Sequence, residues 1–250
     1  MEADERQIQA ANQRKAKQYQ AWQVINTAQG KPGNGGRVAA LHDLHRDGIH
    51  FGGIDISKAY LINLYLKEAS LLNANITGAN LNGANLENAD LFQADLTGTS
   101  LFHANLTEAI LWYANLTRAD LRCTNLAEAI IIDANLTGAN LNKANLTVAT
   151  LTDANLAGAT LMNADLDGAN LDGAILVDAN LTGAYLWRTN LANIKGWGDI
   201  KSIELANIYG VKNPPDGFID WATSSEQGAV EIDDYNKWLE YKGKKRMEQK

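Results

Sequence analysis

Residues 81–96 read LNGANLENADLFQADL, and the spacing within this stretch decides the fold. A leucine stands at every fifth position, with asparagine or aspartate directly before it and alanine one place earlier. Counting in steps of five in both directions from this stretch, an apolar residue stands at every fifth position from Phe51 to Leu191. The exceptions are few: Phe51, Ile56, Ile76 and Ile131 replace leucine, and between Ala69 and Thr189 only Thr99, Thr124 and Thr189 replace alanine. The chain therefore repeats one unit, Ala-(Asn/Asp)-Leu-x-x, without insertion.

A five-residue period matches neither the 3.6-residue turn of an α-helix nor the two-residue alternation of a β-strand. It fits a coil that turns a corner at every unit, so that four units close one four-sided turn. Each residue then lies above the one 20 positions earlier, at about the 4.8 Å spacing of a parallel ladder. Leucine points inward and alanine fills the narrow space beside it. The predicted core positions include Leu81, Leu111, Leu141, Leu171, Ala84 and Ala139.

The repeated unit resembles that of the pentapeptide-repeat proteins over roughly residues 51–191. The resemblance implies an all-β solenoid, a right-handed quadrilateral parallel β-helix, here of about seven coils. Stacked repeats expose apolar side chains and unpaired backbone at both ends, so we expect helical N- and C-terminal caps. The stretch from Tyr19 to Gly30 also resembles leaders that precede the repeats in some bacterial members of this family.

Three segments follow from this pattern. Residues 1–50 form a helical leader and cap, with helices expected at 4–27 and 37–45 because apolar residues recur there at helical spacing. Residues 51–195 form the pentapeptide-repeat β-helix. Residues 196–250 form an irregular last coil and a C-terminal helix, expected at 231–246. The register fails at Gly196, and Pro214-Pro215 ends the coil.

Composition excludes several classes of protein. The 250 residues have a formal net charge of -7, which argues against a nucleic-acid binder held by phosphate contacts. A single cysteine, Cys123, rules out an intrachain disulfide. Because the chain shows neither a signal-peptide pattern nor a long apolar run, the sequence predicts a cytoplasmic location and no membrane partner.

Large apolar residues gather at outward positions of one column. Leu72, Phe92, Trp112 and Ile132 each follow a core position at the 20-residue period, while Ile110, Ile130 and Tyr113 are neighbours of this column. A contiguous apolar patch on the surface usually marks a contact. The sequence leaves two explanations open. The N-terminal helix with Tyr19 and Trp22 folds back over the patch, or a protein partner or second copy of the chain covers it.

Candidate chemistry is sparse. His103, Cys123 and Lys143 stack at successive coils, but catalytic Cys-His pairs need a cleft and an orienting third group. The four histidines lack metal-ligand spacing, with His42 and His45 only three residues apart. The sequence therefore predicts no catalytic residue, no metal site and no cofactor.

The favoured function is a non-enzymatic interaction scaffold or regulator, a rigid rod that binds an unidentified protein or forms a homodimer through the apolar patch and terminal helices. The alternative is an acidic DNA mimic, because some pentapeptide-repeat proteins inhibit DNA gyrase in this way. Mimicry requires one strongly negative face, and Arg118, Arg122, Lys143 and Arg188 interrupt the acidity of the repeat segment.

Overall fold

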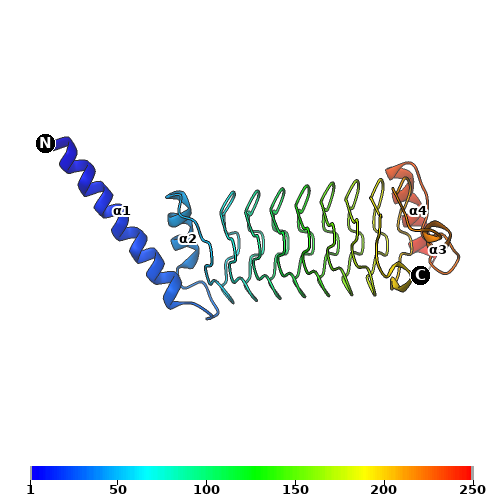
Figure 1. Ribbon diagram of the computed structural model, residues 1–250, viewed down its shortest axis with the longest axis horizontal. Helices are drawn as coiled ribbons and strands as arrows, with labels where there is room; N and C mark the ends of the chain where they lie inside the picture. The colour runs from blue at the N-terminus through cyan, green and yellow to red at the C-terminus, as the bar shows by residue number, and fades with distance from the viewer. Residues whose placement is uncertain (1, 249–250) are drawn as a thin grey trace.

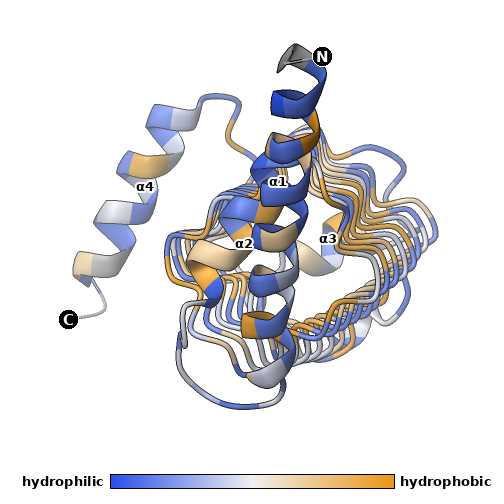
Figure 2. Cartoon of the chain, turned by 90° about the vertical axis from the view of Figure 1, so that its left-hand side faces the viewer, coloured by the Kyte–Doolittle hydropathy of each residue, from blue (hydrophilic) through white to orange (hydrophobic). Residues whose placement is uncertain are grey.

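The computed structural model of the chain describes residues 2–248. Two helices, α1 (Glu2–Thr27) and α2 (Arg37–Arg46), stand at one end of a long stack of coils. The 3-10 helix η1 (Trp197–Asp199) and helices α3 (Phe218–Ala222) and α4 (Tyr235–Glu248) stand at the other (Figure 1). Figure 2 looks along the stack from the N-terminal end and shows the coils superimposed on one outline.

Parallel β-bridges join residues 20 positions apart, from Asp55 with Asn75 to Ile175 with Lys195. This confirms the 20-residue period predicted from the sequence. One bridge falls in every five-residue unit, so each coil has four sides. Each side is too short for more than a single bridge, and within residues 2–248 the coils pair through isolated bridges instead of continuous strands.

The corners of the coils explain the other residues of the repeat. The residue two places after each core position, from Gly53 to Asn193, has a left-handed backbone with φ of 52° to 71°. The asparagine or aspartate before the core leucine accepts a hydrogen bond from the backbone two residues on, as between Asp95 Oδ1 and the N–H of Thr97 at 2.9 Å. Such Asx turns are the local reason for asparagine and aspartate at this position.

The core is a column of leucine and alanine. Leu81, Leu111, Leu141, Leu171, Ala84 and Ala139 are each at most 1% exposed. Thr99, Thr124 and Thr189, which replace alanine, are also fully buried. Each of their hydroxyls donates to a backbone carbonyl of the preceding coil at 2.8 Å, so the buried oxygen is satisfied.

The register changes where the sequence first breaks its period. Gly196 adopts a left-handed conformation and η1 follows it. Beyond η1 the bridges join residues 22 apart, as in Asn180 with Ser202, because two residues have been inserted into the coil. A last bridge, Asn207 with Val230, brings the chain back over the stack after Pro214-Pro215.

The N-terminal cap differs in part from the one expected. Leu41 and Leu44 of α2 are fully buried against the first coil, and Trp22 contacts Phe51 edge-on at 6.4 Å. In α1, however, only Ala21 and Ile25 are buried among the described residues, while Ile8 and Tyr19 are 61% and 67% exposed. The apolar stripe predicted in this helix is therefore mostly solvent-facing, because its N-terminal half projects beyond the stack (Figure 1).

The C-terminal cap is held by α4, which stands at the last coils (Figure 1) and to one side of the stack (Figure 2). Trp238 Nε1 donates to the carbonyl of Leu205 at 3.0 Å, and Lys242 Nζ donates to that of Gly183 at 2.7 Å. The helix begins at Tyr235, four residues later than expected from the sequence. Asp234 explains the later start, because its Oδ1 accepts from the N–H of Lys237 at 2.9 Å as an N-cap.

Candidate functional site

The four sides of the stack carry different outward residues, which the 20-residue register assigns. We call them the apolar face (residues 70–73, 90–93 and so on to 190–193), the threonine face (55–58 to 175–178), the cysteine face (60–63 to 180–183) and the glutamate face (65–68 to 185–188). All seven residues of the predicted apolar patch lie on the apolar face.

Three aromatic rings form the centre of the patch. The rings of Trp112 and Tyr113 are stacked, with their centroids 5.7 Å apart and an interplanar angle of 14°. The Phe92 ring meets both edge-on, with its centroid 6.4 Å from that of Trp112 and 5.9 Å from that of Tyr113. Ile110 and Ile130 are paired by a β-bridge on the same side of the stack. Leu72 and Ile132 continue the column one coil to either side of the aromatic rings.

The patch is open to solvent. Tyr113 is 49% exposed, Trp112 40%, and Leu72 and Ile130 36% each, while Phe92, Ile110 and Ile132 are half-buried. The explanation in which the Tyr19/Trp22 helix covers the patch is wrong. Helix α1 packs on α2 at the end of the stack and extends away from the coils (Figure 1).

Carboxylates lie beside the patch and beyond it on the apolar face. Its outward positions hold Asp90, Asp133, Asp153 and Asp172 and no lysine or arginine. Asp133 touches the patch directly, since Trp112 Nε1 donates to its Oδ2 at 3.4 Å. Asp153 has a loose contact with Lys195, 3.8 Å away, and Asp172 accepts from Asn193 at 2.8 Å. The face therefore combines an apolar patch with acidic side chains beside and beyond it.

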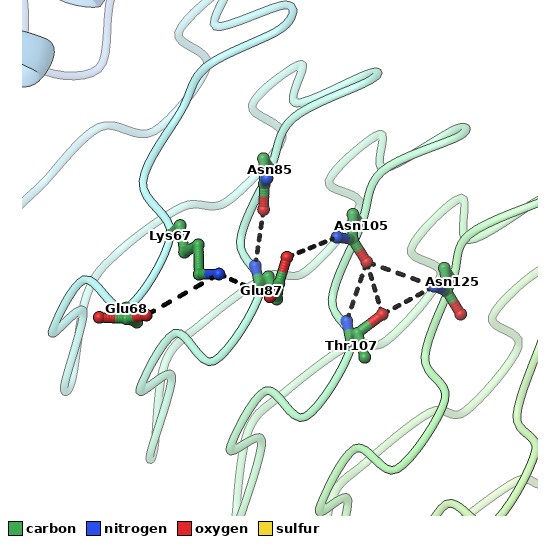
Figure 3. Close-up of polar contacts among 7 residues, drawn as sticks. All are labelled: Lys67, Glu68, Asn85, Glu87, Asn105, Thr107 and Asn125. Atoms are coloured by element: carbon green, nitrogen blue, oxygen red, sulfur yellow. Dashed lines mark hydrogen bonds and ion pairs between the residues drawn. The ribbon is translucent and has the colours of Figure 1, made fainter.

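The neighbouring glutamate face is acidic and internally hydrogen-bonded. Its outward positions hold six acids and two bases. Figure 3 shows its first coils, where Lys67 contacts Glu87 at 2.8 Å and Asn105 donates to Glu87 at 3.4 Å. The Glu87 carboxylate raises the pKa of Lys67 through this hydrogen bond. Asn125 donates to Thr107 at 2.7 Å, so polar contacts link successive coils along this side (Figure 3).

The acidity of the repeat segment is unevenly distributed. The threonine face holds three acids and two bases, and the cysteine face one acid and two bases. The glutamate and apolar faces, which share a corner, therefore carry nearly all of the negative charge. The net charge of each sequence segment does not reveal this segregation. Assigning each charged residue to a face by the 20-residue register does reveal it.

The candidate Cys-His group lies on an outward side of the stack. The His103 ring packs on Phe102 at 4.2 Å between centroids, and Cys123 is a half-buried free thiol on the cysteine face. Within residues 2–248, no cluster of three or more histidine, cysteine or carboxylate side chains has a geometry that could hold a metal ion. In the same range, no helix combines the length and apolar character needed to cross a membrane.

Arg37 is a structural residue that the sequence did not reveal. Its side chain is 1% exposed and donates to the carbonyls of Ala28, Lys31, Gly33 and Asn34. Burial lowers the pKa of this guanidinium. The network closes the segment between α1 and α2, and Gly33 extends it to the stack by accepting from the N–H of Tyr60 at 3.0 Å.

The family model for pentapeptide repeats matches residues 59–195 in overlapping blocks, which is more than half of the chain. The chain therefore belongs to the pentapeptide repeat family. No curated protein sequence matches it.

Solved structures of the same kind resemble the chain. QnrB1, a plasmid-mediated fluoroquinolone resistance protein, is 19% identical with a TM-score of 0.35, covering 72% of this chain and 96% of QnrB1. The pentapeptide repeat protein Rfr23 from the cyanobacterium Cyanothece 51142 is 34% identical with a TM-score of 0.29, covering 48% of this chain and 86% of Rfr23. A pentapeptide repeat protein from Nostoc PCC 7120 is 26% identical with a TM-score of 0.22, covering 52% of this chain and 82% of the other.

Proposed function

We propose that the protein is a non-enzymatic, protein-binding rod of about seven right-handed coils, and that the apolar patch is its docking surface. The observation that carries the proposal is the exposed aromatic group of Phe92, Trp112 and Tyr113 on one side of the stack. Tryptophan and tyrosine dominate the energetics of many protein interfaces because they bury a large area with few rotatable bonds. The cytoplasmic location stays a prediction from the sequence.

The backbone beneath the patch favours binding by a preformed surface. Each coil is joined to the next by backbone hydrogen bonds such as Leu111 N–H to the Ile130 carbonyl at 2.7 Å and Tyr113 N–H to the Ile132 carbonyl at 3.0 Å. A surface already ordered in the free protein loses little conformational entropy when a partner binds. The carboxylates beside the patch favour a partner surface that combines apolar and basic side chains.

The test compares Trp112→Glu with a matched control, Thr77→Glu, which places the same charge at the equivalent repeat position on the threonine face. We expect both variants to melt close to wild type because both positions point outward. Proteins captured from the native cell by wild type and by Thr77→Glu should be lost with Trp112→Glu, and the purified partner should bind directly. The proposal fails if Trp112→Glu retains every protein that wild type retains.

Segregated charge favours a second candidate, the acidic DNA mimic acting on a DNA-binding enzyme such as gyrase. The glutamate and apolar faces together present ten acids and two bases on adjoining sides of the stack. A supercoiling assay with gyrase tests this candidate. Inhibition that weakens in Glu108→Lys/Glu128→Lys supports mimicry, whereas no inhibition at micromolar protein removes it.

A further inference from the structure

We propose that the apolar patch is occupied by helix α1 of a second copy of this chain. In the resulting head-to-head dimer, α1 of each copy packs on the patch of the other. This inference rests on the proposed function of the patch and names its partner. It starts from two exposed surfaces of the same molecule: the patch, and the outer side of α1.

The outer side of α1 carries two apolar residues with a base between them. Ile8, Lys15 and Tyr19 are separated by seven and four residues, so they lie on one side of the helix. Ile8 and Tyr19 are 61% and 67% exposed, and Lys15 is also exposed. A different side of α1 makes the contacts near α2, through Arg14 and Gln18 to Asp47.

Helix α1 cannot reach the patch of its own chain. Its C-terminal end is fixed by the Arg37 network and by burial of Ile25, and Arg14 Nε contacts Asp47 Oδ2 at 3.1 Å halfway along the helix. The hydrogen bonds from Gln18 and Arg14 lower the pKa of Asp47, so this carboxylate stays charged and keeps its contact with Arg14. From this anchor the helix projects away from the coils (Figure 1), which leaves another molecule as the surface it can meet.

The two surfaces match in length. At about 1.5 Å per residue, Ile8 and Tyr19 are roughly 16 Å apart along the helix. Leu72 and Ile132 lie three coils apart, or roughly 14 Å at about 4.8 Å per coil. Ile8 and Tyr19 can therefore pack near the two ends of the patch. The patch occupies the N-terminal half of the stack, so two copies meeting at their N-terminal ends bring each α1 alongside the other's patch.

The charges also match. Helix α1 begins with three acids, Glu2, Asp4 and Glu5, but from Arg6 to Thr27 it holds four bases and no acid, whereas the apolar face holds four aspartates and no base. Lys15 stands between the two apolar anchors, and Asp133 lies within the patch beside Trp112. We assign Lys15 of one copy and Asp133 of the other as an ion pair of this contact. A two-fold dimer makes this contact twice, which doubles the buried area toward the roughly 1,200–2,000 Å² of a stable interface.

Charge reversal and charge swap test the pairing. Lys15→Glu and Asp133→Lys should each weaken self-association, measured by sedimentation over a concentration series, by about tenfold or more. The combined Lys15→Glu/Asp133→Lys protein should recover affinity to within about threefold of wild type, because the pair is restored with opposite sense. Lysine is accommodated at the position of Asp133, since Lys143 has the same left-handed backbone.

Matched controls carry the same charge changes elsewhere. Lys17→Glu alters the other side of α1, and Asp178→Lys alters the equivalent repeat position on the threonine face. Neither should change the dimer constant by more than about twofold. Circular dichroism melting of every variant verifies that the fold is retained. Monomeric wild type at high concentration, or a double variant as weak as the single variants, would overturn the proposal.

The result also separates this inference from the proposed function. If Trp112→Glu abolishes self-association while Lys15→Glu leaves it unchanged, the patch binds a second copy without α1 and the assignment of the helix is wrong. If wild type stays monomeric yet loses a captured protein with Trp112→Glu, the docking function stands and the dimer does not.

Discussion

At the residue scale, the corner position of the repeat has a cost that depends on the side chain. A left-handed backbone costs an L-residue roughly 1–2 kcal/mol, except for glycine and, to a lesser degree, asparagine and aspartate. Most corners here are glycine, asparagine, aspartate or long polar residues. Val148 is the β-branched exception, with φ of 59° and 57% exposure. Because its side chain lies in solvent, little packing gain offsets this strain.

We therefore expect Val148→Asn to raise the free energy of unfolding by about 1 kcal/mol, measured by chemical denaturation. The reciprocal change at another corner, Asn88→Val with φ of 55°, should lower it by a similar amount. Equal stabilities for wild type and Val148→Asn would mean that the corners tolerate β-branched residues without strain.

A second residue-scale prediction concerns Tyr185, which is 5% exposed against Tyr235 and Trp238 of α4. Burial, with Asp167 and Asp165 nearby, raises the pKa of its hydroxyl from 10.0 to about 12. As pH rises, the unfolded chain loses this proton before the folded chain does. The contribution of Tyr185 to the free energy of unfolding is therefore complete below pH 10 and is lost as pH rises from 10 to about 12. Over this range, the free energy of unfolding should fall less steeply in Tyr185→Phe than in wild type.

At the element scale, the placement of α1 depends on one buried side chain. Arg37→Met removes four partly buried hydrogen bonds to backbone carbonyls, which should cost about 1–3 kcal/mol. We expect faster proteolysis between α1 and α2 and a lower melting temperature. Arg37→Lys should behave almost as badly, because one ammonium cannot reproduce the planar guanidinium fork. A protease pattern unchanged in both variants would show that other contacts hold α1.

The elements differ in how far the sequence predicts them. The stack can be predicted because each leucine from Leu61 to Leu191 meets nearly the same surroundings, so one period describes all of them. The direction of α1 cannot be predicted in this way. Ile8 and Tyr19 have the helical spacing of a buried stripe, but no part of the described chain is within reach to cover them. The role of Arg37 is equally hidden, because it depends on carbonyls that the loop brings together only in the folded chain. For the candidate site, the 20-residue register groups the patch residues on one face, whereas their exposure depends on where α1 lies.

At the scale of the whole molecule, the stack is nearly one-dimensional. From Asp55 to Lys195 its bridges join each coil only to the next, 20 residues on, and no bridge within residues 2–248 connects distant coils. In such a stack, stability is the sum of local terms and neighbouring interfaces, so damage stays near its origin. A globular core of the same size would instead lose protection throughout.

Leu111→Ala tests this directly, because it opens a cavity in the middle of the column and should cost roughly 2–5 kcal/mol. Amide hydrogen exchange should then quicken most in the coils around Leu91, Leu111 and Ile131, and least at the two capped ends. Leu171→Ala should move the region of fast exchange by three coils toward α4 while causing a similar loss of stability. If both variants exchange faster uniformly along the stack, the coils unfold as one cooperative unit and the nearest-neighbour description is wrong.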